Sequence, residues 1–193
     1  MKNGSQIKLL ISDFDGTLVN TFEANYCAYQ KAFSECGLNL SIETYQQCFG
    51  LRYDDFMKET DIIEKDLQKK IRQLKGKYYP LFFNKLIPNH PLISFIRSFK
   101  ESGGHTALAS TARKSNLINA LKYLQLEEAF DFILAGEDVS KGKPNPEIYQ
   151  KILNHYRVPA HEALVFEDSN VGIEAAQQAG INYIIINSQF YGN

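Results

Sequence analysis

The sequence predicts an α/β fold, in which a Rossmann-like parallel sheet has helices on both faces and carries an inserted all-helical cap. Three observations predict it. From about residue 88 onward, short apolar runs alternate with segments of helical periodicity. One further apolar run, Ile7–Ser12, stands at the start of the chain, and the stretch from 18 to 87 between them shows helical signals alone. Alternating strands and helices are typical of a parallel sheet covered on both faces.

The expected strands are short, apolar and bounded by turn-forming residues. The first, Ile7–Ser12, stops at the sequence Asp13-Phe14-Asp15-Gly16. The later strands are expected at His105–Ser110, Phe130–Leu134, Ala163–Phe166 and Ile181–Ile186. In an open parallel sheet, ligands bind at the carboxyl ends of the strands. The residues that follow each strand are therefore the first candidates for a site.

The inserted stretch has the period of helices that bury one face. Its first helix carries four aromatic residues at spacings of four and three, namely Phe22, Tyr26, Tyr29 and Phe33. Ser41 is a good cap for the next helix. Residues 58–77 mix both charge signs around apolar positions and predict one amphipathic helix. We expect no strand here, and we expect a helical cap domain at 18–87 and a core domain formed by 1–17 and 88–193.

Composition excludes several classes of protein. The 193 residues carry a net charge of −1, whereas a mainly electrostatic nucleic-acid binder needs a basic excess. The apolar runs are shorter than the roughly 18 residues of a spanning helix or the about 7–15 of a secretory signal. Three cysteines without C-x-x-C spacing predict neither a disulfide framework nor a zinc site. We expect a cytoplasmic protein without nucleic-acid or membrane partners, monomeric or weakly homodimeric.

Two acidic pairs follow expected strands. Asp13 and Asp15 lie in an Asp-Gly turn, and a purely structural turn explains the two aspartates as well as a functional site does. A calcium loop does not, because its sixth and twelfth positions would hold Leu18 and Ala24. The pair Glu167-Asp168 precedes Ser169-Asn170, either of which can cap the following helix.

These two pairs predict a cation site. If the strand before Asp13 and the strand before Glu167 are neighbours in the sheet, Asp13 and Asp168 converge. A group of carboxylates is costly unless a cation neutralises it. Hard oxygen ligands in small number suit Mg²⁺.

Two further clusters follow strands or fixed turns. Lys143 lies between Gly142 and Pro144, and the prolines at 144 and 146 fix the backbone around it. This rigidity suits a cation that must point at one place, although Lys141 shows how readily a solvated lysine occurs here. Ser110-Thr111 ends a strand of small residues and can either satisfy a helix N-terminus or hold a phosphate there.

Together these segments resemble the four motifs of the haloacid dehalogenase-like hydrolases. The matching segments are DFDGTL at 13–18, the strand ending at Ser110, KPNPEIY at 143–149 and FEDSNVGIEAAQQAGI at 166–181. Their order and spacing fit, and the inserted stretch resembles the helical cap of the phosphoglycolate phosphatase and β-phosphoglucomutase branch.

The resemblance implies a role for each residue. Asp13 would be the nucleophile, and Asp15 would be the general acid and base. Ser110 would bind the phosphoryl group, and Lys143 would neutralise part of its negative charge. Asp168, with Asp13 and the carbonyl of Asp15, would bind Mg²⁺. Glu167 would either ligate the ion directly or orient its ligands through hydrogen bonds. Substrate contacts are expected from Gly16, Thr111, Asn170 and Arg52, although a surface arginine beside Asp54 and Asp55 explains Arg52 equally well.

The resemblance implies a Mg²⁺-dependent phosphatase that acts on a small phosphorylated metabolite through an aspartyl-phosphate. True dehalogenases lack the second aspartate, whereas this chain keeps Asp15. The related phosphomutases carry a cap histidine where this chain has Asn25. A phosphomutase and a non-catalytic module that binds phosphometabolites stay open as alternatives.

Overall fold

The computed structural model describes residues 6–187 and residue 191. The chain divides into two compact units, one formed by Met1–Asn20 with Ile87–Asn193 and the other by Thr21–Leu86. The first, here the sheet unit, holds a parallel sheet with its helices, and the second, the helical unit, is built from helices. Among the described helices, none combines the length and apolar character needed to cross a membrane.

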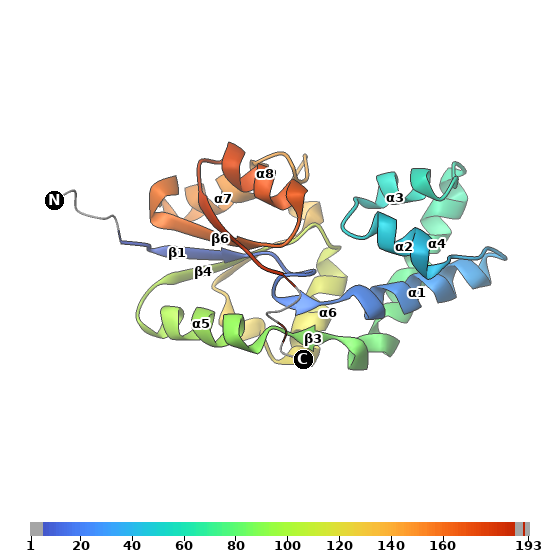
Figure 1. Ribbon diagram of the computed structural model, residues 1–193, viewed down its shortest axis with the longest axis horizontal. Coiled ribbons are helices and arrows are strands. Elements are labelled where there is room, and N and C mark those ends of the chain that lie inside the picture. Colours follow the sequence, from blue (N-terminus) through green and yellow to red (C-terminus); the bar gives the residue numbers. More distant parts are fainter. Residues whose placement is uncertain (1–5, 188–190, 192–193) are drawn as a thin grey trace. The chain divides into compact units, whose positions relative to one another are not determined.

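The main sheet has five parallel strands within the described residues, in the order β5-β4-β1-β6-β7 (Figure 1). Their bounds are β1 Leu9–Ser12, β4 His105–Ala109, β5 Phe132–Leu134, β6 Ala163–Glu167 and β7 Asn182–Ile185. β1 is central, with Ser12 opposite Leu108 of β4 and Phe166 of β6. The predicted Rossmann-like α/β fold is confirmed, and β1 and β6 are the neighbours that convergence of the two acidic pairs requires.

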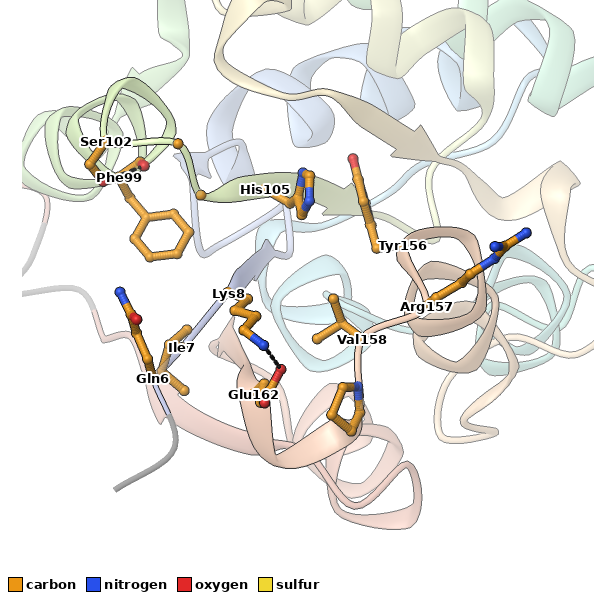
Figure 2. A pocket seen from close by; sticks show the side chains of 13 residues that line it. Gln6, Ile7, Lys8, Phe99, Ser102, His105, Tyr156, Arg157, Val158 and Glu162 are labelled. Atoms are coloured by element: carbon orange, nitrogen blue, oxygen red, sulfur yellow. Dashed lines mark hydrogen bonds and ion pairs between the residues drawn. The ribbon is translucent and has the colours of Figure 1, made fainter. Parts of the chain in front are cut away.

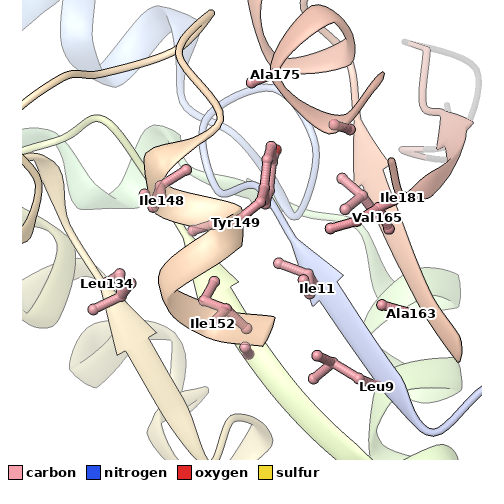
Figure 3. Close-up of a cluster of buried hydrophobic side chains, with 13 residues drawn as sticks. Leu9, Ile11, Leu134, Ile148, Tyr149, Ile152, Ala163, Val165, Ala175 and Ile181 are labelled. Atoms are coloured by element: carbon pink, nitrogen blue, oxygen red, sulfur yellow. The ribbon is translucent and has the colours of Figure 1, made fainter. Parts of the chain in front are cut away.

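Helices cover both faces of this sheet. They are α5 His90–Glu101, α6 Lys114–Leu124, α7 Glu147–Tyr156 and α8 Asn170–Gln178. α5 and α6 lie on one face, and α7 and α8 lie on the other (Figure 1). Alternate strand residues such as Ile11 and Val165 point toward α7, where Ile148 and Ile152 complete a buried cluster (Figure 3). Burying each such side chain contributes about 1.5–3 kcal/mol, and this core fixes the strand ends that carry the acidic residues.

The helical unit contains α1 Phe22–Glu35, α2 Ile42–Cys48, α3 Tyr53–Glu59 and α4 Lys65–Tyr78. Its core is rich in aromatic side chains, and the predicted stripe of α1 contributes to it: the rings of Tyr29 and Phe56 meet edge to face with centroids 4.9 Å apart. Ser41 caps α2 as predicted, since its hydroxyl accepts a hydrogen bond from the Thr44 backbone N–H at 3.1 Å.

Two expectations about the inserted stretch are wrong. Residues 58–77 do not form one helix, because the chain turns at Asp61, whose φ is 57°, and Ile62 inserts into the core. The stretch also begins and ends in a strand: β2 Val19–Asn20 pairs antiparallel with β3 Ile87–Pro88. Strands of two residues are too short to leave a periodicity of two in the sequence. This two-stranded ribbon joins the two places where the chain leaves and re-enters the sheet unit.

Candidate active site

Three carboxylates gather at the carboxyl ends of β1 and β6. Asp13 directly follows β1, Glu167 is the last residue of β6, and Asp168 comes next. Each offers an oxygen, and these oxygens lie within 4.8 Å of one another. The Asp13 backbone N–H donates a hydrogen bond to the carbonyl oxygen of Phe166 at 3.0 Å, which carries the pairing of the two strands up to the site. The predicted convergence of Asp13 and Asp168 is observed.

Lys143 is the buried cation of this acidic cluster. Its Nζ lies 2.6 Å from Asp13 Oδ1 and 2.9 Å from the carbonyl oxygen of Ala109, and it also donates to Glu167 Oε1. Its side chain is 2% exposed. The bond to Ala109 ties the end of β4, and therefore neighbouring Ser110, to the cluster. Lys143 thus points at one place, as the prolines around it suggest.

Both oxygens of Glu167 already have protein partners. Oε1 accepts from Lys143 and from the Tyr149 hydroxyl at 2.7 Å, and Oε2 accepts from the Ser169 hydroxyl at 3.2 Å. A side chain at Gly172 of α8 would stand 2.0 Å from the Glu167 carboxylate, so the helix can lie this close only with glycine there. These contacts indicate that Glu167 positions Lys143 and α8, and they make direct metal binding by Glu167 the less favoured role.

The turn after β1 brings its polar residues to Asp168. Gly16 has φ +91°, and a Cβ there would lie 2.0 Å from Asp168 Oδ2, so this position needs glycine for conformation and for space. The Thr17 hydroxyl donates to Asp168 Oδ1 at 2.8 Å. Asp15 is half-buried in the same turn and close enough to Asp168 to interact with its charge.

The remaining predicted site residues differ in burial. Ser110 is buried, and its hydroxyl accepts a hydrogen bond from the Ala112 backbone N–H at 3.0 Å. Thr111 and Asn170 are exposed, and Ser169, not Asn170, caps α8 through a bond from the Gly172 N–H at 3.1 Å. Arg52 is exposed at the start of α3, in the helical unit.

The acidic cluster has more negative charge than Lys143 can balance. Burial raises the pKa of the Asp13 carboxyl well above its usual range, and Glu167 and Asp168 add to this against the opposing effect of Lys143. Burial also raises the pKa of Asp168 to about 6, again with help from Glu167. Burial disfavours the charged form of Lys143, but Asp13, Tyr149 and Glu167 outweigh it and hold the Lys143 pKa well above its usual range.

This donor set fits a divalent cation. The candidate ligands are hard carboxylate oxygens, they converge, and their negative charge is unbalanced in a buried place. Mg²⁺ prefers such oxygens and binds through one or two carboxylates, with water and phosphate oxygens completing the shell. A cation would restore the ionised forms that burial and mutual repulsion oppose.

A separate cavity of about 540 Å³ lies at the opposite edge of the sheet. Lys8, His105 and Glu162, which stand at the amino ends of β1, β4 and β6, line it (Figure 2). Lys8 and Glu162 form an ion pair across its wall at 2.8 Å, so these two charges satisfy each other. The chemistry-bearing residues gather at the other edge, and the cavity is not part of the candidate active site.

Sequence reasoning missed three contributors to the site. The sequence pattern singles out neither Tyr149, whose hydroxyl binds Glu167, nor Thr17, whose hydroxyl holds Asp168. Tyr191 lies beyond β7 and interacts electrostatically with Asp168, Asp13 and Asp15. The sequence does contain a signal for Tyr149 and Thr17, because both lie in segments that resemble the family motifs. Tyr191 lies in none of these segments.

We predict a stability effect for the buried ion pair. Lys143→Met is expected to lower the free energy of unfolding by about 3–5 kcal/mol at pH 7, because it leaves Asp13 and Glu167 buried without their cation. Denaturant unfolding of the metal-free protein measures this. Lys141→Met is the matched control: this lysine is exposed, and a change within about 0.5 kcal/mol is expected. Equal stability of the two variants would show that Lys143 balances no buried charge.

Comparison with known proteins identifies the family of this chain. The family model of the haloacid dehalogenase-like hydrolases matches residues 10–186. The phosphorylated carbohydrates phosphatase of Thermotoga maritima is 28% identical over 185 residues, which are 92% of this chain and 84% of that protein.

Two solved structures show the same fold. CbbY from Rhodobacter sphaeroides in complex with phosphate has a TM-score of 0.83 at 24% identity, over 96% of this chain and 88% of that chain. The β-phosphoglucomutase of Clostridium difficile has a TM-score of 0.79 at 20% identity, over 95% and 86%. The family match spans nearly the whole chain and includes the acidic cluster with Lys143, and this enzyme therefore belongs to the haloacid dehalogenase-like hydrolases.

Proposed function

We propose that this enzyme is a Mg²⁺-dependent phosphatase that hydrolyses a small phosphomonoester through an aspartyl-phosphate on Asp13. The observation that carries the proposal is the buried Asp13 carboxylate at the end of the central strand, bonded to Lys143 and close to Asp168. Membership of the family and a relative named for phosphorylated carbohydrates support the class of reaction and of substrate.

In the first step, an oxygen of Asp13 attacks phosphorus and the bond to the ester oxygen breaks. Asp15 gives its proton to the leaving alkoxide. Lys143 offsets the negative charge of the group in transfer, and Ser110 holds one of its oxygens. The fixed place of Lys143, bonded to Asp13 and to the end of β4, supports this role because its charge needs no rearrangement during the reaction.

In the second step, Asp15 takes a proton from water as the water oxygen attacks phosphorus. The bond between phosphorus and the Asp13 oxygen breaks, and inorganic phosphate leaves. Asp13, Asp168 and the carbonyl oxygen of Asp15 would hold Mg²⁺, which when bound offsets the charge of the carboxylates and the phosphate. Glu167 keeps Lys143 and Asp168 in place through its own hydrogen bonds.

Asn25 favours a phosphatase over a phosphomutase. The resemblance implies a cap histidine at this position in the mutases, and a histidine can move a proton at neutral pH whereas an amide cannot. Here the Asn25 side-chain amide is buried and donates a hydrogen bond to the Thr21 hydroxyl at 3.0 Å, within the helical unit. These contacts give Asn25 a structural role at the start of α1.

A panel of phosphorylated metabolites assayed with Mg²⁺ tests the proposal, with Asp13→Asn as the blank. Release of phosphate above the blank is expected from at least one small phosphomonoester, and a chelator is expected to abolish it until Mg²⁺ is added back. Full turnover in excess chelator contradicts the metal assignment. Binding of phosphometabolites without any hydrolysis supports the non-catalytic module instead.

Mg²⁺ is expected to raise the melting temperature of the protein, and more so at pH 7.5 than at pH 5. At saturation of about 100 times Kd, binding adds about 2.7 kcal/mol to the free energy of unfolding. In the absence of metal, the pKa of Asp168 is raised to about 6, so at pH 5 a proton competes with the cation and at pH 7.5 it does not. Differential scanning fluorimetry measures the shift, and Asp168→Asn is expected to remove it at both pH values.

Arg52 is proposed to bind a distal anionic group of the substrate. It is exposed, and among the described residues no hydrogen bond or ion pair engages its guanidinium. Arg52→Ala is expected to raise KM for the best substrate about tenfold while small generic phosphate esters are unaffected, because uniform binding is lost. Equal losses on both substrate types would point to damage of the helical unit, and Lys69→Ala, which removes an exposed cation on α4, is the control.

A further inference from the structure

The Tyr191 hydroxyl is a buried polar group that has no hydrogen-bond partner in the part of the chain that the structure describes. Its oxygen is buried, and among the described residues no hydrogen bond engages it. Buried hydroxyls are nearly always hydrogen-bonded, to protein or to an ordered molecule, so an orphaned one calls for a partner. Tyr191 belongs to the sheet unit and follows β7 in the chain.

This hydroxyl lies within electrostatic range of the candidate active site. Tyr191 interacts electrostatically with three carboxylates, those of Asp168, Asp13 and Asp15. Burial raises the pKa of the Tyr191 phenol well above its usual range, and the same carboxylates raise it further. The phenol therefore keeps its proton and can act as a neutral hydrogen-bond donor at the site.

Within the described residues, none of these three carboxylates accepts a hydrogen bond from the Tyr191 hydroxyl. Asp13 Oδ1 accepts from Lys143, and Asp168 Oδ1 accepts from Thr17. A phosphoryl group between Asp13 and Lys143 would bring several strong acceptor oxygens to the same place. A donor that carries no charge can bind such an oxygen without altering the balance between the carboxylates, Lys143 and the cation.

We propose that Tyr191 is a phosphoryl-binding residue of this enzyme, whose hydroxyl donates a hydrogen bond to an oxygen of the substrate phosphoryl group and of the phosphate product. The proposal rests on the proposed function, because it places a phosphoryl group at Asp13. It adds a contact from the chain beyond the last strand, outside the four motifs that carry the family resemblance.

The test compares Tyr191→Phe with the unchanged full-length protein, each saturated with Mg²⁺. Isothermal titration calorimetry with inorganic phosphate gives an equilibrium affinity, and initial rates on the best ester give KM and kcat. Loss of a hydrogen bond to a charged group is expected to weaken phosphate binding about tenfold and to raise KM similarly. Tyr183→Phe is the matched control, because its hydroxyl accepts from Gln177 at 2.8 Å on the exposed side of β7 and α8, and no change is expected.

Two results overturn the proposal. In the first, Tyr191→Phe binds phosphate as tightly as the unchanged protein while both melt at the same temperature. In the second, Tyr191→Phe binds Mg²⁺ more weakly when phosphate is absent but binds phosphate as tightly as before. That result would mean that the hydroxyl binds a water molecule on the cation and not the phosphoryl group. Failure of the phosphatase proposal is a separate result: the unchanged protein then hydrolyses no ester, while the comparison of phosphate affinities still decides the role of Tyr191.

Discussion

Asp13→Asn is expected to abolish phosphomonoester hydrolysis, with a loss in kcat on the order of 10⁴–10⁶. The substitution keeps the shape of the side chain but replaces the carboxylate by a neutral amide, whose remaining oxygen is too weak a nucleophile to form the proposed phosphorylated intermediate. The retained hydrogen bond of the backbone N–H to Phe166 keeps the end of β1 in place. Colorimetric phosphate release under saturating substrate measures the loss, and trapping with acid detects the phosphorylated protein in the unchanged enzyme alone.

A matched control separates chemistry from folding. Asp66→Asn changes an exposed carboxylate on α4 and is expected to leave kcat unchanged. Because Asp13→Asn removes the negative charge next to Lys143, thermal unfolding of this variant should be recorded beside its activity. Activity of Asp13→Asn above about 1% of the unchanged enzyme, with the fold intact, would show that Asp13 is not the nucleophile.

Asp15→Asn is expected to lower kcat by about 10²–10⁴ with esters of poorly leaving alcohols, since general acid–base help is typically worth that factor. Asp15 lies in the turn beside Asp168, outside the buried ion pair of Asp13 and Lys143. The substitution should therefore leave Mg²⁺ binding and the folded state nearly unchanged. Rates on an alkyl phosphate measure the effect.

An aryl phosphate gives the sharper test of Asp15. Its leaving group needs little protonation, so the first step should proceed in Asp15→Asn while the second step, which needs a base for water, stays slow. A burst of aryl alcohol equal to the enzyme concentration, followed by a slow phase, is the expected trace. If the variant behaves like the unchanged protein on both ester types, Asp15 is structural and the two-step mechanism is wrong.

The edge of the sheet that carries the site could be predicted from the sequence because the local signals agree. Apolar runs stop at Asp13, Ser110 and Glu167, and each stop lies at or within one residue of the end of an observed strand. Parallel pairing then brings the ends together without further information. Convergence of Asp13 and Asp168 required that β1 and β6 be neighbours in the sheet, and the structure shows that they are.

Other features depend on contacts between distant residues, which local patterns do not record. Glu167 and Asp168 look alike in the sequence, but the close approach of α8 at Gly172 and the bond from Lys143 draw Glu167 inward. Tyr149 has the spacing of a core residue, and its role depends on a partner 18 residues away. The turn at Asp61 interrupts a helical pattern because Ile62 packs into the core of the helical unit.

The two-residue strands β2 and β3 have a consequence for how such an enzyme can diversify. Since Asn20 pairs with Ile87, the two residues that flank the helical unit in the chain are held together at one point of the sheet unit. Closing a loop there costs little more entropy for a long insert than for a short one. An insertion point with adjacent ends accepts whole modules, so selection can exchange the inserted module while β1 keeps its register in the sheet.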